Sequence, residues 1–295
     1  GQGVLEVDIG EAKFGEAISI LWNELRGGSW VLPCAFAQSD LIRVAYHLLK
    51  GSVWLPTTGV AGTMPLCPLG ELGKLGPDAR DIHDGFQPMT GETTYPAFWN
   101  HDASLVTTLG QSQNRYLSPL AKAKPGRNLR KVQDLWPKAG RILIAERLRF
   151  NTQRLAAIRL QNKALSNVWW PFFSKHDNEQ TEKALILWLN STIGLIILLA
   201  HREETEGAWM KFKKPVLGGL PVLAVNSLEP DKLRILSGTY DKLCKEELLP
   251  FPHMAHDPTR QAIDYTITQV LGLSDISILR EILAREPVVC LKPLT

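Results

Sequence analysis

The most constraining feature of the sequence is an almost unbroken apolar run from Ala184 to Ala200. A membrane-spanning helix needs about 20 predominantly apolar residues. This run is shorter, and Asn190, Ser191 and Thr192 place polar groups at its centre, where lipid makes them costly. A helix that is apolar on nearly all sides is typical of a protein interior. We therefore expect one buried helix here and no membrane partner.

Length and cysteine usage set the broad class of the protein. A chain of 295 residues can bury a sizeable core in one large or two modest domains. The start of the chain shows no cationic leader before an apolar run, so we expect no secretory signal and a cytoplasmic location. The cysteines form no Cys-x-x-Cys pair and have no His at metal-ligand spacing, which favours reduced structural thiols at Cys34, Cys67, Cys244 and Cys290.

Positive charge is concentrated in one stretch of the chain. Residues 115–163 contain thirteen Lys or Arg and only two acids, Asp134 and Glu146, so this stretch carries a net charge of +11. The whole chain has 33 bases and 30 acids, which leaves a charge of −8 for the remaining residues. Such an asymmetry indicates a polyanionic partner.

Composition divides the chain into three segments. Residues 1–56 show strand and helix patterns and are predicted to form an α/β segment. A Gly-, Pro- and Thr-rich stretch at 56–70 marks a domain boundary. Residues 57–226 predict a twisted, mainly antiparallel sheet with the apolar helix late in the segment, and residues 227–295 predict helices. The expected fold class is α+β.

The first segment begins with a strand pattern at residues 4–9. The next residues predict a helix, with one apolar face made by Phe14, Ala17, Ile18 and Leu21. Gly10 and Gly15 resemble a Gly-rich cofactor turn, but Ala12 stands where a second close-approach glycine is needed. We therefore expect an ordinary joint between strand and helix, and no cofactor bound by this chain.

Capping residues predict where the other helices begin. A helix over residues 39–49 is expected to be capped by Ser39. In the last segment, three helix starts are indicated, at Ser227 with Pro230, at Asp257 with Pro258, and at Ser274.

Acidic residues cluster around His83, at Asp78, Asp81 and Asp84. Carboxylates and a His within seven residues could bind a divalent metal ion, which would make the chain a metal-dependent nuclease or other hydrolase. Polar runs of this kind also form capped turns, and we favour the turn. The hydrolase is kept as the alternative function, and no metal site is assigned.

The basic stretch contains a strand pattern at residues 141–150. Its alternation places Leu148 and Phe150 on one face and Arg147, Arg149 and Asn151 on the other. Arg can bond the O6/N7 edge of guanine, and Asn or Gln can bond adenine. The alternative is a solvated sheet face, but the local charge favours nucleic acid.

Two groups of DNA-binding residues are predicted. The expected base-edge contacts are Arg147, Arg149, Asn151, Gln153 and Arg154. The expected phosphate contacts are Arg127, Arg130 and Lys131 in the basic stretch, and Lys211, Lys213 and Lys214 in a connection that follows the apolar helix.

The order of several short motifs resembles the target recognition domains of bacterial restriction-modification systems. These motifs are a helix with Leu189, Asn190 and Ser191, then a variable loop, then a strand that reads Leu220-Pro221-Val222, and finally a helix that begins after Ser227. The Leu-Gly-Glu-Leu phrase at 69–72 looks like the first strand of such a domain. The similarity is to type I specificity subunits and to the C-terminal domains of single-chain adenine-N6 DNA methyltransferases, and covers about residues 64–250.

The resemblance implies that the apolar helix packs under a recognition sheet and anchors DNA-facing loops, with Asn190 and Ser191 ending or bonding a turn in the interior. It further implies that double-stranded DNA is a partner, and that a methyltransferase catalytic domain or subunit is another. Residues 1–56 would then be the end of the methyltransferase domain or an adaptor to it.

Adenine-N6 methyltransferases carry an Asn-Pro-Pro-Tyr-type motif that holds the flipped adenine. This sequence contains neither an Asn-Pro nor a Pro-Pro dipeptide. We therefore expect no catalytic residues in this chain. Catalysis, and the S-adenosylmethionine that it uses, are expected upstream or in another subunit.

Overall fold

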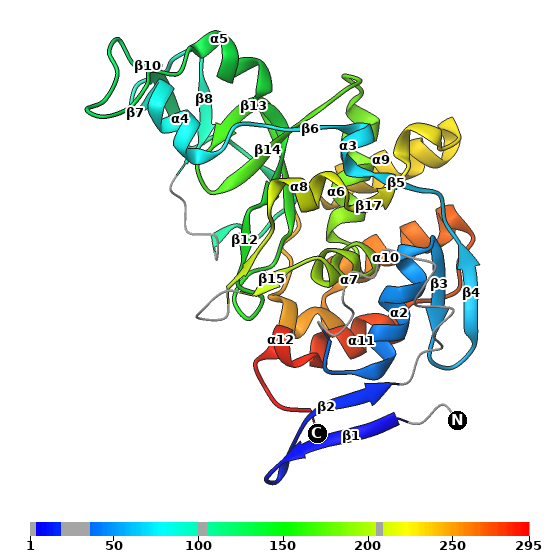
Figure 1. The fold of residues 1–295 in the computed structure, drawn as a ribbon. Helices are drawn as coiled ribbons and strands as arrows, with labels where there is room; N and C mark the ends of the chain where they lie inside the picture. The colour runs from blue at the N-terminus through cyan, green and yellow to red at the C-terminus, as the bar shows by residue number, and fades with distance from the viewer. Residues whose placement is uncertain (1–3, 19–35, 100–104, 205–208, 295) are drawn as a thin grey trace.

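The computed structural model describes residues 4–18, 36–99, 105–204 and 209–294 (Figure 1). One large sheet with helices packed around it confirms the predicted α+β class. Cys34 and Leu21, which entered the sequence-based predictions, lie outside the described residues. Cys67, Cys244 and Cys290 are free thiols.

The large sheet has eight strands, in the order β6-β14-β11-β13-β8-β10-β7, with β9 paired to β13. β13 runs parallel to β8 and β9, whereas the other pairs are antiparallel, which confirms the predicted mainly antiparallel sheet. The strands are β6 (Gly73–Leu75), β7 (Phe86–Met89), β8 (Pro96–Phe98), β9 (Gly110–Gln111), β10 (Arg115–Pro119), β11 (Gly140–Ala145), β13 (Ala157–Ser166) and β14 (Trp169–Ser174).

Apolar sequence explains why β11 lies in the middle of this sheet. Ile142, Leu143 and Ile144 are all fully buried, so successive side chains on both faces of the strand are covered. A continuous apolar run, unlike an alternating one, suits a strand that is packed on both faces. β13 and β14 flank β11 on either side.

The apolar run forms two helices, not the single helix predicted. These are α6 (Glu179–Asn190) and α7 (Thr192–Ala200), and they meet at an angle of 69°. Ser191 separates them, and its Oγ accepts a hydrogen bond from the Gly194 amide at 3.1 Å, capping α7. Every residue from Ala184 to Ala200 is buried, so the predicted burial is confirmed.

Among the described residues, no single helix has the length and apolar composition needed to cross a membrane. The bent α6–α7 pair meets that criterion only when its two helices are taken together.

Several smaller sheets lie outside the large sheet. β3 (Ser52–Leu55) pairs with β4 (Gly59–Thr63), β5 (Leu66–Pro68) pairs with β17 (Pro221–Leu223), and β16 (Met210–Lys211) lies between β12 (Arg147–Leu148) and β15 (Glu203–Glu204). The expected strand at Leu220-Pro221-Val222 is therefore present as β17. The Leu-Gly-Glu-Leu phrase, however, forms the helical turn α3 (Leu69–Leu72), not a strand.

Short helices occupy several connections. They are α4 (Ala79–Gly85), α5 (Val132–Leu135), η3 (Trp136–Lys138), α8 (Lys214–Gly218), η5 (Val225–Ser227) and η6 (Phe251–His256).

The N-terminal helix predicted from Phe14 onward is wrong for the described residues. β1 (Val4–Ile9) and β2 (Ala12–Ile18) form an antiparallel hairpin, and Gly10 has a φ of 68° at its turn. Glycine adopts this left-handed conformation without a steric penalty. The glycine pattern considered as a cofactor turn is therefore a hairpin turn.

The predicted helix over residues 39–49 is confirmed as α2 (Ser39–Leu49), but Ser39 does not cap it. Instead, a carboxylate oxygen of Glu16 on β2 accepts hydrogen bonds from the amide of Ser39 at 2.8 Å and from its Oγ at 2.5 Å. A long-range side chain thus satisfies the first turn of this helix.

The C-terminal segment is helical, as predicted. Its helices are α9 (Pro230–Leu243), α10 (Pro258–Leu271), α11 (Ser277–Arg285) and α12 (Pro287–Cys290). Asp257 caps α10 by accepting from the amides of Thr259 and Arg260, which confirms that start. α9 begins after Glu229, so Ser227 is not its cap, and Asp275, not Ser274, bonds the first amide of α11.

One continuous hydrophobic core contains residues from all three predicted segments, including Leu41, Leu187 and Leu279. The β3–β4 hairpin also crosses the boundary placed at residue 56. A second, smaller core lies under α4, α5 and β10, and includes Ile82, Phe86 and Leu117. The domain boundaries themselves stay a prediction.

Candidate nucleic-acid interface

Two basic sequences that lie far apart in the chain meet in the small sheet of β12, β16 and β15. Arg147 of β12 is the register partner of Lys211 of β16, and Leu148 is the partner of Met210. Leu148 and Met210 are buried, whereas Arg147 is exposed and Lys211 half-buried. We call the two strands β12 and β16, together with Arg149 and Lys213 at their ends, the basic ribbon. The third strand, β15, is acidic, and its Glu203 is the register partner of Lys211 on the other side.

The predicted alternation around Leu148 is confirmed by burial. Leu148 and Phe150 are buried, and Arg147 and Arg149 are exposed. The predicted strand over 141–150 is not continuous, because β11 ends at Ala145 and its neighbours differ from those of β12. After this break, Arg147 and Leu148 pair with β16 and no longer belong to the large sheet.

Gln153 does not lie on the exposed face that the sequence predicted. Its side chain is 4% exposed, and its Oε1 accepts a hydrogen bond from the Arg149 amide at 2.7 Å. Its own carbonyl accepts from the Phe251 amide. Gln153 therefore stabilises the turn that follows β12.

Asn151 and Arg154 are also drawn inward by this turn. The Oδ1 atom of Asn151 is buried and has no hydrogen-bond donor among the described residues. Arg154 donates to the carbonyl of Leu248 at 2.9 Å and lies 3.8 Å from Glu247. The structure thus leaves Arg147 and Arg149 exposed, whereas Asn151 and Arg154 are half-buried and Gln153 is buried.

The loop between β10 and α5 is a second basic surface. Residues 121–131 are all exposed, and we call them the basic loop. Arg127 pairs with Asp84 at 2.9 Å and Arg130 with Asp81 at 2.9 Å, so two ion pairs fasten the loop to α4. In Figure 1 the loop lies at the upper left beside β10, with β12 below it.

The carboxylates of the acidic cluster around His83 take part in capping and in the ion pairs of the basic loop. Asp78 caps α4 by accepting the Asp81 amide at 2.9 Å, while Asp81 and Asp84 bind the two arginines of the basic loop. The described residues contain no group of three His, Cys, Asp or Glu side chains suited to a metal ion. These contacts favour the capped turn over the metal-dependent hydrolase.

Some of the thirteen Lys and Arg residues in the 115–163 stretch form ion pairs, and the others do not. Five have acidic partners, namely Arg127, Arg130, Arg141, Arg154 and Arg159. Among the residues that the structure describes, the other eight have none: Arg115, Lys122, Lys124, Lys131, Lys138, Arg147, Arg149 and Lys163. The basic loop and the basic ribbon therefore keep uncompensated charge that an anion can neutralise.

The lysines that follow the apolar helices have different surroundings. Lys213 pairs with Glu203 of β15 at 2.8 Å, and both side chains are substantially exposed. Lys214 donates from Nζ to the carbonyl of Gly76 at 2.8 Å. Burial, followed by repulsion from Lys138, lowers the pKa of Lys214. Lys213 thus belongs to the basic ribbon, and Lys214 lies by the β6 edge of the large sheet.

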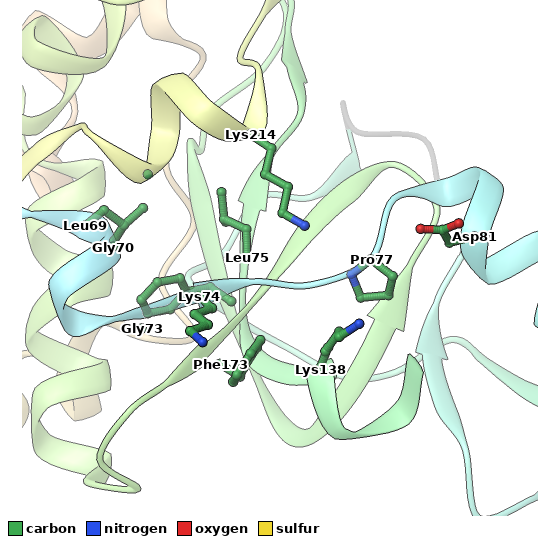
Figure 2. A pocket seen from close by; sticks show the side chains of 12 residues that line it. Leu69, Gly70, Gly73, Lys74, Leu75, Pro77, Asp81, Lys138, Phe173 and Lys214 are labelled. Carbon is green, nitrogen blue, oxygen red and sulfur yellow. The ribbon is translucent and has the colours of Figure 1, made fainter. Parts of the chain in front are cut away.

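Lys214 lines a cavity of about 440 Å³ together with Lys74 and Lys138 (Figure 2). The sequence did not single out either of these two lysines. Lys138 was one base of a long run, and Lys74 lies alone in "GELGKLG". A strand pattern at residues 73–75 could have indicated Lys74 as an exposed side chain. In β6, Lys74 is exposed between the buried Gly73 and Leu75.

His83 lies between the basic loop and the second core. Its ring makes an edge contact with Trp99, with ring centroids 5.0 Å apart. Burial lowers its pKa, Lys124 and Arg127 lower it further, and Asp84 opposes them. The pKa of His83 therefore depends on the charge of the basic loop.

Comparisons with protein-family models, with curated proteins and with solved structures gave no match.

Proposed function

We propose that this chain binds double-stranded DNA and supplies target recognition to an adenine-N6 DNA methyltransferase of a restriction-modification system. The pairing of Arg147 with Lys211 carries the proposal, because it brings two distant basic sequences side by side in one small sheet. The methyltransferase part rests on the order of motifs described above. Its catalytic domain or subunit would bind S-adenosylmethionine.

The shape of the basic ribbon suits groove recognition. The major groove of B-DNA is about 12 Å wide and accepts a two-stranded ribbon. Arg149 follows β12 directly, and its guanidinium has no partner among the described residues, so it is available for a base edge. Arg147, Arg149 and Lys211 are the contacts that we assign to the groove.

The basic loop suits contacts with phosphate. Lys122, Lys124 and Lys131 are exposed and unpaired in the described part of the chain, while Arg127 and Arg130 hold the loop on α4. Lysines placed in this way bind phosphate as point charges and set the register of the protein on the duplex without reading sequence. The loop would strengthen binding to every sequence alike.

Fluorescence anisotropy with a labelled random duplex at several salt concentrations tests the proposal. The logarithm of the affinity should fall linearly with the logarithm of salt, with a slope of about −0.9 for each phosphate contact. The double variant Lys122→Gln/Lys124→Gln should reduce that slope by about 2.

Lys242→Gln/Lys245→Gln is the matched control, because it removes the same charge from exposed positions at the end of α9. Its slope should equal that of the unmodified chain. Equal slopes for all three proteins would place the phosphate contacts away from the basic loop. Absence of binding at low salt, both alone and with the catalytic partner restored, would rule out the proposed function.

A further inference from the structure

A cavity of about 440 Å³ lies at the β6 edge of the large sheet, between α3, α8 and η3. Three lysines reach it from three different elements: Lys74 from β6, Lys138 from η3 and Lys214 from α8. Figure 2 shows Lys138 and Lys214 extending toward each other from opposite sides of the segment that contains Pro77. This volume lies in the range of small-molecule pockets in proteins, about 300–1,000 Å³.

Two of these lysines have no acidic partner. Within the described residues, Lys74 and Lys138 form no ion pair, whereas Lys214 donates to the carbonyl of Gly76 and is attracted by Asp78 and Asp81. Asp81 also lines the cavity, but its carboxylate is paired with Arg130 at 2.9 Å. The charge of Lys74 and Lys138 in this cavity is therefore available for an anion.

The rest of the wall is largely apolar. Leu69, Leu75, Pro77 and Phe172 contribute to it, and Phe173 adds a half-buried aromatic ring. A small inorganic anion would leave this apolar surface unused. A ligand that joins a phosphate to a flat ring matches both parts, because base rings stack on aromatic side chains.

We propose that this cavity binds a nucleotide, with its phosphate held by Lys74 and Lys138 and its base packed against Phe173. The nucleotide can be a free molecule or one unit of a strand. The inference rests on the cavity and does not depend on the basic ribbon or on the proposed DNA recognition.

Isothermal titration calorimetry of the full chain with deoxynucleoside monophosphates tests this assignment. The monophosphates should bind at least tenfold more tightly than inorganic phosphate, and the unphosphorylated nucleosides more weakly than either. Lys74→Gln and Lys138→Gln should each reduce the affinity for the monophosphates about fivefold or more. Lys245→Gln removes an exposed charge outside the cavity and should leave binding unchanged.

Competition with a short single-stranded oligonucleotide separates the two sources. Tighter binding of the oligonucleotide than of the monophosphate, lost in the same lysine variants, would assign a strand. Binding of the monophosphate alone would assign a free nucleotide.

Equal affinity for inorganic phosphate and the monophosphates would overturn the proposal in favour of a simple anion site. So would an affinity that Lys74→Gln and Lys138→Gln leave unchanged while their thermal unfolding matches that of the unmodified chain. Arg149→Gln should weaken duplex binding but leave the affinity for monophosphates unchanged. The experiments can therefore overturn nucleotide binding by the cavity and DNA binding by the basic ribbon independently of each other.

Discussion

The side chain of Asn190 forms hydrogen bonds with both backbone groups of Ala157: its Oδ1 accepts from the amide at 3.4 Å, and its Nδ2 donates to the carbonyl at 2.8 Å. Oδ1 also accepts from the amide of Ala156 at 2.9 Å, and Nδ2 donates to the carbonyl of Ile186 at 2.9 Å. Asn190 is fully buried. A single satisfied amide thus joins the end of α6 to β13 of the large sheet.

Asn190→Ala should therefore strongly destabilise the chain. The substitution leaves backbone groups of β13 buried without a partner, and each such group costs about 1–3 kcal/mol. We expect the free energy of unfolding to fall by about 2–4 kcal/mol, measured by urea denaturation. Asn226→Ala, at an exposed position in η5, should change it by less than about 0.5 kcal/mol. Similar losses in both variants would contradict this role of Asn190.

Gly194→Ala and Gly238→Ala should shift stability in opposite directions. A Cβ added at Gly194 would lie 2.0 Å from the carbonyl oxygen of Trp188, so α7 could no longer pack on the last turn of α6. Overpacking of this kind costs about 1–3 kcal/mol. A Cβ at Gly238 in α9 would meet nothing within 4 Å, and alanine there should stabilise the helix by about 0.5–1 kcal/mol. Thermal unfolding of the two variants measures the contrast.

Local patterns predicted those parts of the fold that depend on neighbouring residues. The bounds of α2, the Asp257 cap of α10 and the alternation around Leu148 all follow from residues within a few positions of each other. The burial of the apolar run was also predictable from composition. Its division into two helices was not, because one helix was expected over the whole run, with Asn190 and Ser191 ending or bonding a turn in the protein interior.

Long-range contacts account for what the sequence could not predict. The spacing of Phe14, Ala17 and Ile18 fits a helix, but pairing with β1 makes them part of a hairpin. The partnership of Arg147 with Lys211 requires β12 and β16 to meet, and no local pattern indicates it. Gln153 was expected to be exposed because a strand was extended past Leu148, where the chain instead turns.

Arg149→Lys should relax the preference for one base pair while preserving affinity for random DNA. Lysine keeps the charge but loses the planar fork that bonds guanine through two atoms. We expect a loss of about 1–3 kcal/mol in discrimination at that position. Selection of bound sequences from a random duplex library measures this discrimination. A uniform loss across all sequences would identify Arg149 as a phosphate contact.

His201→Gln should remove part of the acid sensitivity of the fold. Burial lowers the pKa of His201 from its usual 6.5, and Nδ1 donates to the carbonyl of Ile197 at 2.7 Å. The folded state therefore holds this ring neutral, and the unfolded state takes up a proton more readily. The stability is fully present above about pH 6.5 and is lost as pH falls toward the lower folded pKa. Urea denaturation at about pH 7.5 and 5 should show a smaller difference for His201→Gln than for the unmodified chain. An equal difference would mean that His201 titrates alike in both states.

DNA binding at the basic loop should raise the pKa of His83. Burial lowers this pKa in the free protein, and Lys124 and Arg127 lower it further. A phosphate bound to Lys124 would cancel the repulsion from that side chain, so the complex would hold the proton on His83 more tightly than the free protein does. Binding then takes up a proton, and affinity should rise as pH falls through the range in which the ring titrates.

Anisotropy titrations between about pH 5 and 8 measure this linkage. His83→Gln should flatten the dependence of affinity on pH, whereas His253→Gln, at an exposed position in η6, should retain it. A direct check is NMR of the His83 ring, whose midpoint should move upward when duplex is added. An unchanged midpoint in a saturated complex would place the phosphates away from Lys124, and the basic loop would then not be the phosphate-binding surface.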